Sequence, residues 1–176
     1  MTRAQLTARY LPVARTLWGG LTVSNVILGV VSFVVPPSER ALDPGVVRVL
    51  CVFALGAAVG SFVLPRYLVA SNMRRSQVLP GGVGRDGKPL PARFADPVAA
   101  SRQAMSRGQV PFILSMALSE TVSLFGFMLH MTGAPMSIST GLIAVGTLLA
   151  ASRFPTPGRL LGSYERAHEA SFEAEG

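Results

Sequence analysis

The sequence predicts an all-α integral membrane protein, a four-helix bundle of two transmembrane hairpins joined by a long cytoplasmic loop. Of the 176 residues, 49% are hydrophobic and only 14% are charged, whereas soluble domains average roughly a quarter charged residues. The hydrophobic residues lie in four blocks that are nearly free of charge, a pattern typical of membrane spans and not of a soluble core. We therefore expect one membrane domain over residues 1–176.

Each block is close to the roughly 20 apolar residues that a helix needs to cross a hydrocarbon core of about 30 Å. The second block ends at Pro65 and reaches full length if Arg48 extends its charged end to the membrane surface. The third block contains one charged residue, Glu120. The predicted spans are 16–35, 46–64, 110–131 and 136–152.

The first block could also be a signal peptide, because three arginines precede it. Its apolar stretch is longer than the apolar core of a typical signal peptide, however, and no small-x-small cleavage motif follows. We expect an uncleaved first span. The single cysteine, Cys51, lies in the second span, which argues against a disulfide framework.

The basic residues predict the orientation, because lysine and arginine are retained on the cytoplasmic side of a membrane. Eight of the 16 lie within residues 66–109, three precede the first span and three follow the last. The connections 36–48 and 132–135 carry little net charge. The loop 66–109, the N-terminus and the tail 153–176 are therefore predicted to be cytoplasmic, in the inner membrane of a bacterial-type cell. The net charge of +7 then suits an anionic lipid surface, and we expect no nucleic-acid partner.

Two segments outside the predicted spans contain residues that predict their secondary structure. Residues 76–97 are rich in Gly and Pro, which predicts an irregular linker. Asp96 as N-cap and Pro97 in the first turn predict a short helix that ends at Gly108 and Pro111.

The tail also has helical spacing, and its apolar stripe consists of Leu161, Tyr164, His168 and Phe172. The stripe would dock on the loop or on a partner, and the alternative is a frayed, solvated terminal helix.

Glu120 is the candidate functional residue, because a carboxylate near the middle of a span costs several kcal/mol unless it finds a partner, a proton or an ion. No Lys or Arg lies at comparable depth in the other spans, so we expect Glu120 to be protonated. Its expected supporting polar residues are Ser119, Ser123, Ser61 and Asn25. The role is either ion binding or a structural link between helices. His130, near the end of the same span, is expected to be an interfacial residue and not a metal ligand.

Glycines predict where helices approach each other. Gly56 and Gly60 form a small-xxx-small face in the second span, which permits close packing against another helix. Gly19, Gly20, Gly141 and Gly146 could serve the same purpose in the first and last spans.

The second and third spans resemble the hairpin of the proteolipid, or subunit c, of rotary ATP synthases. Gly56, Ala58 and Gly60 match its Gly/Ala-rich first helix. Ala117-Leu118-Ser119-Glu120, followed by Leu124-Phe125-Gly126, is similar to its ion-binding helix. The resemblance implies that Glu120 binds a proton or a cation.

No motif in the sequence predicts catalysis, a cofactor or a metal site, so we do not expect an enzyme. The favoured hypothesis is a small polytopic inner-membrane protein that acts through helix association. It would be an accessory or assembly component with a membrane-protein partner, or a homo-oligomer. The alternative is proton or cation handling through Glu120, in a proteolipid-like assembly or a small transporter.

Overall fold

The computed structural model describes residues 3–38, 43–71, 78–81 and 92–172. Within these residues the chain is mostly helical, and three helices are long and apolar enough to span a membrane. They are α2 (Leu11–Val34), α3 (Pro44–Ser71) and α4 (Pro97–Met131). A fourth apolar helix, α5 (Met136–Ala151), is shorter. The prediction of a helical membrane protein is confirmed at this level.

The chain divides into two compact units where the sequence predicted one domain. The first, here called the bundle unit, comprises residues 16–65 and 112–154. The second, the α/β unit, comprises residues 1–15, 66–111 and 155–176. Its remaining elements are α1 (Arg3–Thr7), α6 (Pro157–His168), β1 (Val78–Leu79), β2 (Ala92–Phe94) and β3 (Ala170–Ser171).

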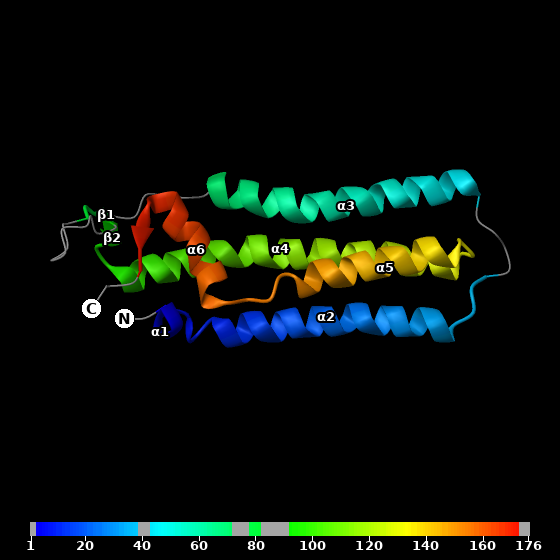
Figure 1. Cartoon of the computed structure of the whole chain (residues 1–176), viewed down its shortest axis with the longest axis horizontal. Coiled ribbons are helices and arrows are strands. Elements are labelled where there is room, and N and C mark those ends of the chain that lie inside the picture. The colour runs from blue at the N-terminus through cyan, green and yellow to red at the C-terminus, as the bar shows by residue number, and fades with distance from the viewer. Residues whose placement is uncertain (1–2, 39–42, 72–77, 82–91, 173–176) are drawn as a thin grey trace, which may run out of the picture. The chain divides into compact units, whose positions relative to one another are not determined.

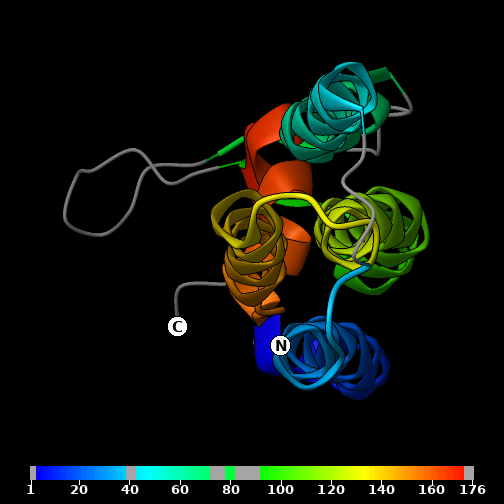
Figure 2. The ribbon, with the colours of Figure 1, turned by 90° about the vertical axis from the view of Figure 1, so that its right-hand side faces the viewer.

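In the bundle unit, α2 to α5 lie side by side with alternating directions (Figures 1 and 2). At one end, the Nε1 of Trp18 on α2 donates a hydrogen bond to the carbonyl of Ala150 on α5, at 2.9 Å. The opposite end contains the tight turn between α4 and α5. There Gly133 adopts φ 79°, a left-handed conformation that glycine takes without a steric penalty.

Two helices are longer than the sequence predicted. α3 does not end at Pro65 but continues to Ser71, and α4 does not end at Gly108 and Pro111 but continues from Pro97 to Met131. An internal proline removes one backbone hydrogen bond, and a long membrane helix held on both sides of it tolerates that loss.

The predicted start of α4 is confirmed. The carboxylate of Asp96 accepts hydrogen bonds from the amides of Val98 and Ala99, both at 2.9 Å. This is the bonding pattern of an N-cap.

The α/β unit corrects one expectation, because it contains short β-strands where an irregular linker was predicted. β2 pairs antiparallel with β1 and parallel with β3, so the chain is not purely α-helical. The rest of the predicted linker, residues 76–77 and 82–91, lies outside the described residues.

The core of the α/β unit joins the loop to the tail. Phe94 is only 5% exposed, and its ring lies 4.4 Å from that of Phe172 and 5.6 Å from that of Tyr164, measured between centroids. The Tyr164 hydroxyl lies 3.1 Å from Gln103 Oε1 of α4 and donates to it. Of the two alternatives for the tail, docking on the loop is therefore observed. The ring of His168 lies 4.2 Å from that of Tyr164, measured between centroids, in a tilted arrangement.

Candidate functional site

Glu120 lies on α4 near the middle of the apolar stretch Phe112–Met131 and is partly buried. Ser24 of α2 donates a hydrogen bond from its hydroxyl to Glu120 Oε1 at 2.8 Å. The carboxyl group therefore links two helices. Ser24 was not predicted, because hydropathy does not reveal which face of α2 turns toward α4.

The four supporting residues predicted from the sequence make their hydrogen bonds elsewhere. Ser119 donates to the carbonyl of Ser115 in its own helix, and Ser61 to that of Ala58. Ser123 donates to the carbonyl of Ile143 on α5 at 3.3 Å, and Asn25 donates to that of Leu21 at 3.0 Å.

Several of these side chains nevertheless lie at one depth in the bundle. A Cβ added at Gly146 of α5 would lie 2.7 Å from the carbonyl oxygen of Ser119, so Gly146 is level with Glu120. Ser24 contacts Glu120 directly, and Asn25 follows it in α2. The set Ser24, Asn25, Ser119, Glu120 and Ser123 is called the polar layer below.

Two oxygens at or beside the polar layer have no hydrogen-bond partner among the described residues. They are the amide oxygen of Asn25, a residue with no exposed surface, and the hydroxyl oxygen of Thr22, three residues earlier on α2. A buried acceptor without a donor costs on the order of 1–3 kcal/mol. α2 thus contains two buried oxygens without a hydrogen-bond partner among the described residues, and one of them, that of Asn25, lies in the polar layer.

α4 and α5 make a close contact. A Cβ at Gly126 would lie 2.7 Å from the carbonyl oxygen of Ser139, and one at Gly146 would overlap the Ser123 hydroxyl. Such distances require glycine, because real Cβ atoms essentially never come this close to backbone atoms. Gly146 has the packing role that the sequence suggested for it.

Of the Gly56/Gly60 face predicted to pack against another helix, Gly60 meets α4 within the chain and Gly56 does not. No described atom lies within 4 Å of a Cβ added at Gly56. A Cβ at Gly60 would lie 3.7 Å from a methyl group of Leu118 on α4, an ordinary van der Waals contact, and equally far from one of Leu64 in its own helix. α3 buries a different face, which includes Ala54 and Ser61, both with no exposed surface. A small-xxx-small pattern permits a close contact but does not require one. Gly19, Gly20 and Gly141 also have no described atom within that distance.

His130 is only 4% exposed, so it is more deeply buried than the interfacial position predicted for it. Its Nε2 lies 2.9 Å from the carbonyl oxygen of Val35 on the chain following α2. The nearby amide of Ser38 donates to the carbonyl of Met131 at 3.3 Å. His130 therefore helps to hold the ends of α2 and α4 together.

No protein family, curated protein or solved structure was found to match this chain. The resemblance to the rotary ATP synthase proteolipid consequently remains a prediction that rests on the residues given above.

Proposed function

We propose that the protein is a small polytopic membrane protein that acts through helix association, as an accessory or assembly component or as a homo-oligomer. The observation that carries this proposal is the face of α3 around Gly56. Gly56 is exposed and has no described atom within 4 Å of an added Cβ, while Val52 and Val59 beside it are 68% and 53% exposed. A glycine between valines forms a shallow notch that admits a neighbouring helix backbone.

The membrane arrangement is part of the same proposal. α5, with 16 residues, is about 24 Å long, slightly less than a hydrocarbon core of roughly 30 Å. Its close contact with α4 at Gly126 and Gly146 supports a fourth span that pairs with the third. The basic residues favour an inner-membrane protein with both termini and residues 66–109 in the cytoplasm.

The mass of the detergent-extracted protein tests helix association. We expect the wild type to be larger than the 18.5 kDa of one chain, and Gly56→Leu to reduce the mass to that of one chain by filling the notch. Val26→Leu is the matched control, because Val26 is an exposed apolar residue of α2 with 51% exposure.

The measured mass also separates the forms of association. A multiple of the chain mass indicates a homo-oligomer, and any other mass indicates a complex with a different membrane protein. A wild type that is a single chain in both mild detergent and nanodiscs would contradict the proposal.

Proton or cation handling through Glu120 is the second candidate. It is favoured by the Ser24–Glu120 hydrogen bond within the apolar stretch, and by the buried oxygens of Asn25 and Thr22 on α2, which lack hydrogen-bond partners among the described residues. Carboxylate and neutral oxygens together are the ligands of hard cations, and an ionisable group within a membrane is a functional candidate by default. The alternative role for Glu120 is the interhelical link itself.

A further inference from the structure

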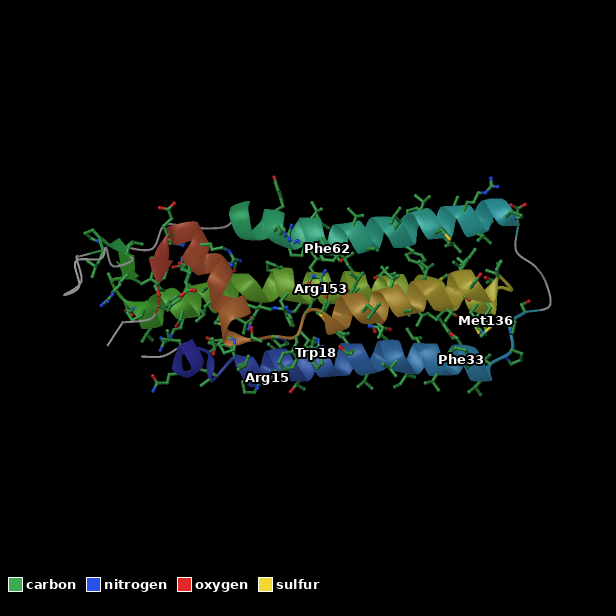
Figure 3. The ribbon with its side chains drawn as sticks, viewed as in Figure 1. Arg15, Trp18, Phe33, Phe62, Met136 and Arg153 are labelled. Carbon is green, nitrogen blue, oxygen red and sulfur yellow. The ribbon has the colours of Figure 1, made fainter. Side chains whose placement is uncertain are left out.

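Arg153 follows α5 and reaches across to α3 in the bundle unit (Figure 3). Its Nη2 donates a hydrogen bond to the hydroxyl of Ser61 at 3.0 Å. The centre of the guanidinium group lies 4.9 Å from the centroid of the Phe62 ring, a cation–π distance. The side chain is therefore held in one position by two neighbouring residues of α3.

The positive charge of Arg153 has no carboxylate partner among the described residues. In the described part of the bundle unit the acidic residues are Asp43 and Glu120. Asp43 lies before the first turn of α3, about 27 Å along the helix from Ser61, and binds the amide of Gly45. Glu120 is bonded to Ser24. Burial lowers the pKa of Arg153 from its usual value, but a guanidinium remains protonated.

Some N–H donors of the Arg153 guanidinium have no hydrogen-bond acceptor among the described residues. Nε is buried without a partner. Among the described residues Nη1 has no acceptor, and it is not one of the buried atoms without a partner. A guanidinium with free amino groups binds the oxygens of a phosphate group in preference to most other anions.

The depth of Arg153 suits a lipid headgroup. Trp18 donates to the carbonyl of Ala150, and its ring meets that of Phe154 edge-on at 4.9 Å. Tryptophan is enriched at the level of the headgroups, where its ring is in apolar surroundings and its N–H is near water. Arg153 lies directly before Phe154 in the chain, at this level.

We propose that Arg153, positioned by Ser61 and Phe62, binds a phosphate group where the end of α5 meets α3. The phosphate belongs either to an anionic phospholipid or to free phosphate in solution. This site is separate from the polar layer and from the Gly56 face, so its test is independent of the proposed function.

Two probes distinguish the sources. Phosphatidylglycerol is titrated into the detergent-purified full-length protein, and bound lipid is counted by native mass spectrometry. Inorganic phosphate is tested separately by its effect on the unfolding temperature. We expect Arg153→Gln to weaken binding of phosphatidylglycerol by about tenfold or more, since a charge-assisted hydrogen bond is lost. Arg48→Gln is the matched control, because it removes the same charge from an exposed position near the other end of α3.

Each outcome of the two measurements either identifies the source of the phosphate or overturns the site. Weaker lipid binding in Arg153→Gln alone identifies the lipid headgroup as the source. Stabilisation by inorganic phosphate that Arg153→Gln abolishes, with unchanged lipid binding, identifies free phosphate. Equal behaviour of the wild type and Arg153→Gln toward both probes overturns the site. If Arg153→Gln does not fold, Arg153→Lys and Ser61→Ala replace it, and unchanged binding of both probes in those two variants overturns the site equally.

Discussion

Replacing Gly146 with alanine tests whether backbone contact between α4 and α5 stabilises the bundle. The added methyl group would lie 2.7 Å from the carbonyl oxygen of Ser119 and 2.8 Å from the amide nitrogen of Ser123, and it would overlap the Ser123 hydroxyl. The hydroxyl can rotate away, but the two backbone atoms cannot, so the helices must separate. Overpacking of this kind costs about 1–3 kcal/mol.

Gly141→Ala is the matched control on the same helix, because no described atom lies within 4 Å of a Cβ added there. Both variants share the intrinsic preference of a helix for alanine over glycine, roughly 0.5–1 kcal/mol. The difference between them therefore isolates the steric clash. We expect the free energy of unfolding of Gly146→Ala to be lower than that of Gly141→Ala by about 1–3 kcal/mol.

Unfolding of the detergent-solubilised protein by SDS, followed by the fluorescence of Trp18, measures this difference. Trp18 is the single tryptophan, and because its Nε1 bonds to Ala150, its emission reports the contact between α2 and α5. Adding Ser123→Ala to Gly146→Ala should not restore stability, since the backbone contacts persist. Equal stability of the two glycine variants would refute the close approach of α4 and α5.

Four further predictions concern other parts of the chain. Glu120→Gln should preserve assembly whichever role Glu120 has. If Glu120 handles ions, a carbodiimide should label the wild type at Glu120 and the variant should lose ion binding. Absence of carbodiimide labelling would remove the ion-handling alternative. Ser24→Ala should lower the free energy of unfolding of the bundle by about 1 kcal/mol, because the hydrogen bond to Glu120 is lost. The same SDS unfolding measures this change, and an unchanged stability would show that the bond is not needed. Phe94→Ala should lower the free energy of unfolding of the α/β unit by about 3–5 kcal/mol and make the tail susceptible to limited proteolysis. A tail as resistant to proteolysis as that of the wild type would contradict its docking. A cysteine at the exposed position Ser106, in a Cys51→Ser background, should resist an impermeant thiol reagent in intact cells, and its labelling would reverse the proposed orientation.

The sequence predicted the structure correctly where that structure depends only on residues close together in the chain. The Asp96 N-cap was predicted correctly, because a cap depends on the next three residues alone. The apolar stripe of the tail was also predicted, but its target was left open, since Phe94 is about 70 residues away from Tyr164 in the chain. The stop signals at Pro65, Gly108 and Pro111 were wrong, because the preference of an isolated residue is smaller than the stabilisation of a long helix by its neighbours.

The sequence by itself determined that the chain is a helical membrane protein and that α4 contains a carboxylic acid deep in its apolar stretch, because hydropathy adds up along each segment without reference to the others. Only the tertiary structure decided which helix faces meet. Glycines that satisfy the same packing pattern occur in several helices, yet Gly126 and Gly146 form the close contact while Gly56 faces outward. In the same way, Ser24 and not Asn25 binds Glu120. The rotation of a helix about its axis depends on steric fit with its neighbours, and that fit is a property of pairs of helices that no single segment contains.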